Sequence, residues 1–342
     1  MELWIHQTIA GFPFWALVVV LVFFICLLSK GADILVDEAV ALSVRLSVPP
    51  MLLGATVVSL GTTLPEAAVS VMAALEGNPG LALGNAVGSI ICDTGLILGI
   101  GALMKPLPIN RNLVNRQGWI QFGAGVMLVA ACYPWSHPNQ VLSEGGHFPQ
   151  AVGFFFVACL VVYFIWSYRL SRRGDDSVCS EDVDKEQEKD ASTLFVLLKL
   201  VLGIFLVVLS SKVLIPTASE MAVRMSIPEG VIAASLVAFG TSLPELITVV
   251  TSVRKGHADL AIGNVVGADI LNVFFVVGVS GAVTKGGLVA STEFFTHLFP
   301  FMLAVLIIFR AGIFFSKKAL GRFFGVLLLL FYLIFLYVNY GA

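Results

Sequence analysis

The stretch Gly61-Thr-Thr-Leu-Pro-Glu66 returns later in the chain as Gly240-Thr-Ser-Leu-Pro-Glu245. In both copies a Gly-Asn-x-x-Gly segment follows at the same distance, at 84–88 and at 263–267. A constant offset of 179 residues aligns thirty-nine positions of the two copies without a gap, and fifteen of them are identical. Chance hydrophobic similarity would not select Gly, Pro, Asn and Glu. The sequence therefore predicts an internal duplication.

The composition predicts an integral membrane protein. Hydrophobic residues make up 58% of the 342 residues, charged residues only 12%, and the mean hydropathy is +0.95. Such a chain has too little polar surface to coat a water-soluble globule of this size. The five cysteines show no paired or C-x-x-C spacing, which argues against a disulfide framework or a zinc site.

Hydropathy divides the chain into apolar segments that are long enough to cross a bilayer as helices. A span needs roughly 20 apolar residues. By this measure we expect an all-α membrane protein with ten transmembrane helices, near 13–40, 48–76, 80–104, 115–133, 148–169, 193–222, 228–253, 259–283, 290–311 and 319–339.

The distribution of basic residues predicts the orientation. With both termini outside, fifteen Lys and Arg residues fall in cytoplasmic loops or beside them, against only Arg224 and Lys285 outside. The two motif copies then cross the membrane in opposite senses, as inverted repeats of five spans each. We expect a first repeat at 1–169, a polar cytoplasmic linker at 170–192 and a second repeat at 193–342.

The repeated motif combines residues that suit a hard cation. Pro65 and Pro244 have no N–H and collide with the carbonyl four residues back, so we expect each span to bend or unwind at the preceding glycine. Freed carbonyls and hydroxyls are oxygen ligands of the kind that Ca²⁺ prefers. The candidate ligands in the two motifs are Thr62, Thr63 and Glu66, and Thr241, Ser242 and Glu245.

The segment after each motif carries a second set of polar residues at helical spacing. Positions 85, 89 and 93 share one helical face, as do 264, 268 and 272. Small residues at 84 and 88, and at 263 and 267, allow close packing of this span against a neighbour. The further candidates are Asn85, Ser89 and Asp93 in the first copy, and Asn264 and Asn272 in the second.

These paired motifs resemble the alpha repeats of the cation/calcium antiporter superfamily, most closely the prokaryotic sodium/calcium exchangers. The resemblance implies a midplane site formed by discontinuous helices 2, 3, 7 and 8, past which the first and sixth spans slide. It implies that Glu66 and Glu245 are the central calcium ligands and that Thr62, Thr63, Thr241 and Ser242 contribute oxygens to calcium and sodium. It also assigns Ser89 to a flanking sodium position, and Asp93 and Asn272 to the paired carboxylate and amide positions.

The chain departs from the family pattern at three places. The acid of the later pair is Asp93 in the first copy and the amide is Asn272 in the second, which reverses the usual arrangement. Ala268 replaces a serine and so puts one flanking sodium site in question. Ile90 and Asp269 stand where the family has Asn. The spacing leaves open whether Asp269 faces the cluster. If it does, four carboxylates lie together, which favours proton-coupled or potassium-assisted transport.

The sequence therefore predicts a secondary antiporter that exchanges Ca²⁺ for Na⁺, with exchange for protons and dependence on potassium as the nearest alternatives. An ion channel remains a further alternative. We expect no enzymatic activity, no cofactor and no nucleotide or nucleic-acid partner, and the chain contains no P-loop. The expected surroundings are the lipid bilayer of a prokaryotic plasma membrane, and one chain carries a complete inverted pair, which is compatible with a monomer.

Overall fold

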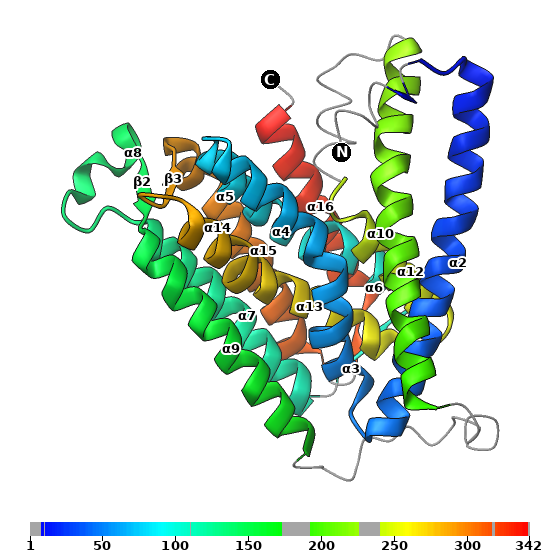
Figure 1. The fold of residues 1–342 in the computed structure, drawn as a ribbon. Coiled ribbons are helices and arrows are strands. Elements are labelled where there is room, and N and C mark those ends of the chain that lie inside the picture. The colour runs from blue at the N-terminus through cyan, green and yellow to red at the C-terminus, as the bar shows by residue number, and fades with distance from the viewer. Residues whose placement is uncertain are drawn as a thin grey trace.

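The computed structural model describes residues 8–9, 11–109, 111–172, 192–225, 240–316 and 319–340, and most of these residues are helical (Figure 1). The main helical elements are α2 (Phe14–Leu46), α3 (Pro50–Leu53), η1 (Gly54–Val58), α4 (Ser59–Leu75), α5 (Pro79–Ile91), η2 (Cys92–Ile97), α6 (Leu98–Met104), α7 (Arg111–Cys132), α9 (Gln150–Arg172), α10 (Thr193–Arg224), α12 (Leu243–Arg254), α13 (Ala258–Leu271), η5 (Asn272–Val277), α14 (Gly278–Val283), η6 (Phe294–Leu298), α15 (Phe299–Phe315) and α16 (Arg322–Tyr340). Short elements η3 (Pro138–Gln140) and α8 (Val141–Glu144) connect α7 to α9.

Eight of the described helical stretches are long and apolar enough to cross a membrane. The chain is accordingly a nearly all-helical multi-pass membrane protein. Of the other two predicted spans, 115–133 forms the more polar helix α7. The span predicted at 228–253 lies partly outside the described residues, as does most of the predicted linker at 170–192.

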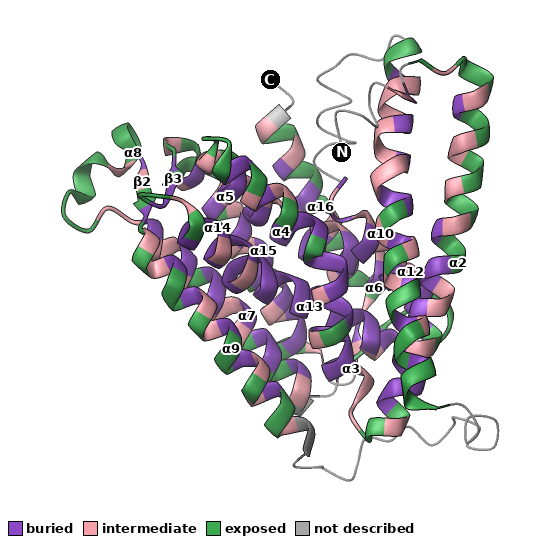
Figure 2. Cartoon of the chain, viewed as in Figure 1, coloured by how far each residue is buried: buried purple, intermediate pink, exposed green. Residues whose placement is uncertain are grey.

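Burial increases from the outer helices to the centre of the bundle (Figure 2). In the most apolar window of α2 only 17% of the residues are buried, whereas 94% are buried in the stretch from α13 to α14. The long helices α2 and α10 pack side by side at one edge (Figure 1). A Cβ at Gly203 would lie 2.7 Å from the Leu35 backbone nitrogen, so a small residue is required at this crossing.

Two short antiparallel ribbons connect the first half of the chain to the second. Strand β1 (Leu107–Pro108) follows α6 and pairs with β4 (Ala319–Leu320), which precedes α16. Strand β3 (Leu288–Ala290) follows α14 and pairs with β2 (Gly146–Phe148), which precedes α9. Each half thus contributes one strand to each ribbon.

Pro65 lies inside α4, and the helix continues through it. Of the bend or unwinding predicted at Gly61, the unwinding is therefore not observed in α4. The irregularity is the π-helical turn η1, which lies about one turn earlier. A π turn absorbs backbone strain while most carbonyls keep partners, which matters where no water can replace a lost hydrogen bond.

In the second copy the motif marks the start of a helix. Residues 240–242 form a turn, and α12 begins at Leu243 with Pro244 in its first turn. Proline is tolerated there because its missing N–H would have no helical acceptor.

The two motif helices end in the same way. Gly77 after α4 has φ +86° and Gly256 after α12 has φ +90°. The amide of Asn78 donates to the Ala73 carbonyl and the amide of His257 donates to the Ser252 carbonyl, each at 2.8 Å. Only glycine adopts this left-handed conformation without cost, which explains why it recurs at the same place in both copies.

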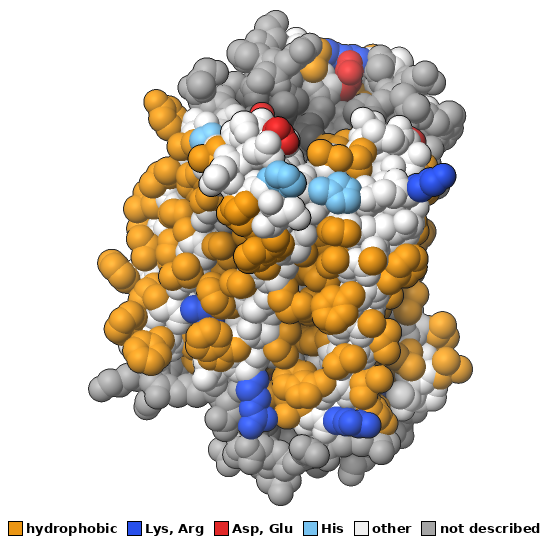
Figure 3. Space-filling view, turned by 90° about the vertical axis from the view of Figure 1, so that its left-hand side faces the viewer, with side chains coloured by type: hydrophobic (Ala, Val, Ile, Leu, Met, Phe, Trp, Pro, Cys, Tyr) orange, Lys and Arg blue, Asp and Glu red, His pale blue; other side chains and the backbone are white. Residues whose placement is uncertain are grey.

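Hydrophobic side chains form a broad band around the molecule. Figure 3 shows this band on one face, with Lys and Arg side chains near its lower edge and with His and acidic side chains, as well as some Lys or Arg, near its upper edge. The lower end is the one at which α9 ends and α10 begins (Figure 1). An apolar band between charged borders is the expected outer surface of a membrane protein.

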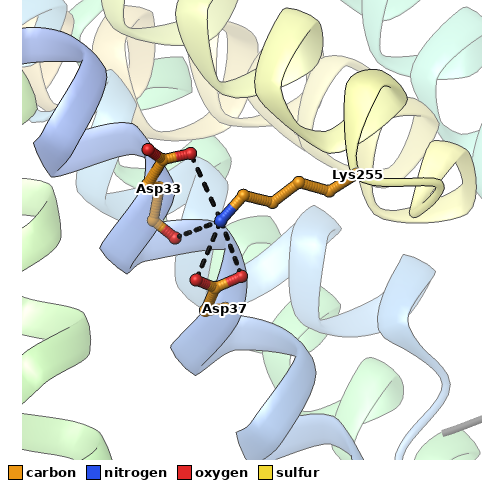
Figure 4. A network of polar contacts seen from close by, with 3 residues as sticks. All are labelled: Asp33, Asp37 and Lys255. Carbon is orange, nitrogen blue, oxygen red and sulfur yellow. Dashed lines mark hydrogen bonds and ion pairs between the residues drawn. The ribbon is translucent and has the colours of Figure 1, made fainter.

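An ion-pair network ties the end of α12 to α2 outside the buried centre. Figure 4 shows Lys255 reaching between Asp33 and Asp37 of α2. Its Nζ lies 2.8 Å from the Asp37 carboxylate and 3.2 Å from Asp33 Oδ1. Burial lowers the pKa of Lys255, but its hydrogen bonds to Asp37 and Asp33 outweigh burial and raise the pKa above its usual value.

Candidate ion-binding site

The two motif copies bring their acids and hydroxyls into the interior of the bundle. Thr62, Thr63 and Glu66 project from α4 and are buried. Ser242 directly precedes α12 and Glu245 lies in its first turn, and both are buried. Each glutamate is only 1% exposed. A carboxylate so far from water is costly unless positive charge or hydrogen-bond donors compensate it.

The helices that follow the motifs carry the second set of polar residues. In both copies the helix passes into a π-helical turn beside the polar residue, with Asp93 as the second residue of η2 and Asn272 as the first of η5. Ser89 and Asn264 lie on the preceding helices α5 and α13 and are buried. π turns inside helices often occur at functional sites because they redirect side chains and backbone carbonyls.

Hydrogen bonds join the two copies across the centre. The hydroxyl of Thr62 in α4 reaches Asn264 Oδ1 in α13 at 3.4 Å. The hydroxyl of Thr241 before α12 reaches Asn85 Oδ1 in α5 at 3.5 Å. The offset of 179 residues converts one pair into the other, so the duplication is visible in the contacts of the site as well as in its sequence.

Asn85 is held further by its own half of the chain. Its Nδ2 donates to Ser70 Oγ at 3.0 Å and to the Glu66 carbonyl at 3.4 Å. Ser70 and Glu66 both belong to α4. This amide therefore fixes α4 against α5 and presents its oxygen to the second motif.

Glycines allow α3 and η1, which precede the first motif, to pack closely against α13. A Cβ at Gly263 would lie 2.1 Å from the Met51 carbonyl oxygen, and one at Gly267 would lie 2.5 Å from the Ala55 Cα. A Cβ at Gly54 would lie 2.6 Å from the Leu260 carbonyl oxygen. Larger residues at these positions would separate the helices, and with them the polar side chains that face one another.

Four acids meet in this interior. Glu66 lies within electrostatic reach of Glu245 and Asp93, and Asp269 lies within reach of Asp93 and Glu245. All four are at most 2% exposed, and no Lys, Arg or His is buried among the described residues. Oxygens of all four, Glu66 Oε2, Asp93 Oδ1, both Glu245 oxygens and Asp269 Oδ1, have no hydrogen-bond partner within the described part of the chain.

The oxygens come from carboxylates, hydroxyls and amides together. Within the described ranges no three His, Cys, Asp or Glu side chains converge tightly enough to chelate a metal by themselves. An ion at this site would therefore take neutral ligands beside the acids. The buried Thr63 and Ser242 hydroxyls and the Asn272 Oδ1, which have no hydrogen-bond partner among the described residues, are suited to that role.

The structure settles the direction of Asp269. Its Oδ2 accepts hydrogen bonds from the Thr94 hydroxyl in η2 and from Gln121 Nε2 in α7. Gln121 Nε2 also lies 3.2 Å from Thr94 Oγ1. Asp269 thus faces the interior, beside Asp93, and is held from two other helices.

Sequence reasoning did not single out Thr94, Gln117, Gln121 or Tyr163. The Tyr163 hydroxyl in α9 donates to the Ala55 carbonyl in η1 at 2.9 Å, and Gln117 Oε1 lies 3.2 Å away. Gln117 and Gln121 are one turn apart in a span and are buried, so two glutamines at a spacing of four in a membrane helix were the available signal.

The comparison with known proteins bears on this arrangement of duplicated motifs. The profile of the sodium/calcium exchanger protein family matches residues 16–169 and 195–341. The chain belongs to this family. The match includes both motif copies and leaves out the residues between 169 and 195.

Individual relatives match over nearly the whole chain. The inner membrane protein YrbG of Escherichia coli is 31% identical over 88% of this chain and 90% of its own length. The sodium/calcium exchanger MaX1 of Methanosarcina acetivorans is 30% identical over 91% of this chain and 95% of its own. A structure of the sodium-calcium exchanger NCX_Mj soaked with Na⁺ and Sr²⁺ superposes with a TM-score of 0.76, at 25% identity, over 94% of this chain and 98% of that one.

Membership places the chain in a family named for exchange, that is, for transport rather than for chemical conversion. The fold agrees along nearly its full length with a solved exchanger.

Proposed function

We propose that this chain is a secondary antiporter that exchanges Ca²⁺ for Na⁺ by alternating access. The observation that carries the proposal is the cluster of buried acids contributed by both motif copies, inside a member of the sodium/calcium exchanger family. Buried carboxylates without buried basic partners among the described residues need a cation or a proton to neutralise them, and the surrounding ligands are oxygens, which suit Ca²⁺ and Na⁺.

The proposed calcium ligands are Glu66 and Glu245, which come from the two copies and lie within electrostatic reach of each other. Hydroxyls and carbonyls of the two motifs complete the coordination, and the paired positions 93 and 272 supply one carboxylate and one amide. Pro65 has no N–H to offer the Gly61 carbonyl, which therefore is free to serve an ion although α4 stays helical. The proposed set of ion ligands is Thr62, Thr63, Glu66, Asn85, Ser89 and Asp93 with Thr241, Ser242, Glu245, Asn264, Asp269 and Asn272.

We also propose ten spans in two inverted repeats, with the linker at 170–192 and both termini on the outer side. The two ribbons support it, because β1 pairs with β4 and β3 with β2, as an exchange of strands between two related halves requires. The π turns η2 and η5 at matching positions support it too. The Lys and Arg side chains at the end of the molecule where α9 ends and α10 begins support a cytoplasmic location for that end (Figure 3).

Exchange for protons or dependence on potassium is the second candidate. Asp269 favours it, because this fourth acid adds a negative charge to those of the two motif glutamates and Asp93. A channel is less well supported, because one inverted pair within a chain is the architecture of alternating access.

The experiment is uptake of ⁴⁵Ca²⁺ into proteoliposomes loaded with Na⁺, repeated with a pH gradient without Na⁺, and with K⁺ added or omitted. The proposal predicts uptake against a calcium gradient that depends on the outward Na⁺ gradient. Uptake driven by protons alone would replace Na⁺ as the counter-ion, and purely downhill flux would indicate a channel.

The matched variants are Glu66→Gln and Glu245→Gln, which remove one ligand charge and almost no volume. Each is expected to abolish calcium uptake while the protein folds and inserts. Glu76→Gln is the control, because Glu76 is an exposed acid at the end of the same helix as Glu66. Normal uptake by both site variants would refute the assignment of the two glutamates.

A further inference from the structure

Asp269 has no acidic counterpart in the first copy. The offset of 179 residues pairs it with Ile90, and it pairs Thr94 with Val273. Gln121 comes from α7, outside the repeated motifs. The group formed by Asp269, Thr94 and Gln121 therefore does not obey the duplication, unlike the crossed pairs made by Thr62 and Thr241.

Two oxygens of this group are buried and without a partner among the described residues. They are Asp269 Oδ1 and Gln121 Oε1. Asp269 is 2% exposed, Gln121 2% and Thr94 fully buried. Two donors satisfy only one oxygen of the carboxylate, so its second oxygen and the amide oxygen are left for a ligand.

The charge of the whole cluster points to the kind of ligand. Glu66, Glu245, Asp93 and Asp269 carry four negative charges if all are ionised, and one Ca²⁺ balances only two of them. Thr94 and Gln121, which donate to Asp269, are neutral, so Asp269 supplies the single negative charge of this group of three. A monovalent cation matches the single charge of Asp269, and with one Ca²⁺ at the paired motifs it lowers the uncompensated charge of the whole cluster from two to one in a medium that penalises charge.

We propose that Asp269, Thr94 and Gln121 form a binding site for one alkali-metal cation that is additional to the ions held by the paired motifs. The carboxylate, the hydroxyl oxygen and the amide oxygen are the ligands, and Gln121 turns its amide to offer Oε1. The proposal rests on the proposed antiport function, and it adds one Na⁺ or K⁺ to the ions that the paired motifs hold during the cycle.

The experiment measures how ⁴⁵Ca²⁺ uptake by proteoliposomes depends on Na⁺ concentration, with and without K⁺, for the wild type and for Asp269→Asn, Thr94→Val and Gln121→Leu. Asp259→Asn is the control, because Asp259 lies on the same helix α13 near its other end. Calcium–calcium exchange without Na⁺ is measured for every variant, as a readout of the motif pair alone.

The proposal predicts that Asp269→Asn lowers the Hill coefficient for the alkali cation by about one, since that coefficient is bounded by the number of interacting sites. Thr94→Val and Gln121→Leu are expected to raise the half-maximal cation concentration by about tenfold, as loss of a supporting group does at metal sites. These effects should exceed any effect on calcium–calcium exchange, and Asp259→Asn should behave as the wild type. Whether Na⁺ or K⁺ shows the change identifies the cation.

Two results would overturn the proposal. One is an unchanged Hill coefficient and half-maximal concentration in all three variants while wild-type exchange is normal. The other is loss of the pH dependence of uptake in Asp269→Asn with the alkali-cation dependence intact, which would make the acid a proton carrier. A wild type that moves no calcium under any gradient would instead refute the antiport function itself.

Discussion

The two copies of the Gly-Thr-x-Leu-Pro-Glu motif begin differently and end alike. The first copy lies inside a continuous helix, α4, with Pro65 in its interior. The second begins a helix, with a turn at 240–242 and Pro244 in the first turn of α12. Both helices then finish in a glycine of positive φ with the same hydrogen bonds. The duplication thus preserves the side chains and the exit turn, while the backbone at the proline is free to differ.

The motif proline therefore does not dictate a single backbone conformation. A proline inside a helix removes one hydrogen bond and costs about 3 kcal/mol, whereas in the first turn it costs little. In α4 neighbouring helices hold the chain in a helix despite this cost. In both copies a proline follows a glycine by four residues, and the proline has no N–H to donate to the glycine carbonyl.

Among substitutions that compare positions where the two copies differ, the largest effect is expected at Asp93 and Asn272, where the copies differ in charge. Asp93→Asn and Asn272→Asp each change the total charge of the cluster, and each should lower ⁴⁵Ca²⁺ uptake on the order of 10- to 100-fold. The double variant moves the acid from the first copy to the second at constant charge and should retain more uptake than either single variant. Additive losses in the double variant would mean that the two positions are not interchangeable.

A smaller effect is expected at the crossed hydrogen bonds. Thr62→Val and Thr241→Val each remove one hydroxyl from matching contacts with Asn264 and Asn85. A neutral hydrogen bond contributes about 1 kcal/mol, so the apparent calcium affinity should fall by about fivefold in each variant. Titration of uptake with Ca²⁺ measures this, and a loss confined to one copy would show that the contacts are not equivalent.

Substitution of the two prolines is expected to change the free energy of unfolding in one copy and not in the other. Pro65→Ala restores a helical hydrogen bond to Gly61 and should raise the free energy of unfolding by up to about 3 kcal/mol, while it weakens calcium binding by occupying that carbonyl. Pro244→Ala lies in a first turn and should change the free energy of unfolding little. Thermal unfolding in detergent and calcium titration measure both. Equal stabilisation by the two substitutions would contradict the difference between the two backbones.

The smallest effect concerns the ends of the motif helices, where Lys255 is the counterpart of Glu76. Because Lys255 is partly exposed, its pairs with Asp33 and Asp37 contribute only about 0.2–1 kcal/mol, less at high salt. Lys255→Met should lower the unfolding temperature slightly at low salt only. Since the pKa of Lys255 is raised, this contribution is present below the ordinary lysine pKa and is lost as the pH rises through the folded value. A salt-independent loss would point to packing instead.

The sequence predicted the membrane class and eight of the apolar helices, and it located the paired motifs, because these follow from composition and from repetition. Gly263 and Gly267 illustrate this, since their spacing predicted the close helix packing that the structure shows. The placement of Glu66 and Glu245 in the interior likewise followed from two acids that recur in apolar segments.

The sequence did not reveal the parts of the site that are not repeated. Gln121 and Thr94 come from different elements, and only the packing of α7 and of η2 against α13 brings them to Asp269. The sequence predicted a bend or an unwinding at Gly61, and α4 remains helical there, so local proline sterics alone did not fix the backbone. The direction of Asp269 required the rotation of α13, which spacing alone does not fix.

The most direct test of a single site built from both copies is the number of calcium ions bound per chain. Equilibrium dialysis of the purified protein with ⁴⁵Ca²⁺ should give one tightly bound ion for the wild type, and Glu66→Gln and Glu245→Gln should each eliminate it despite their different backbones. Two ions per wild-type chain, with one surviving in each variant, would show that the copies bind calcium separately and would contradict the shared site.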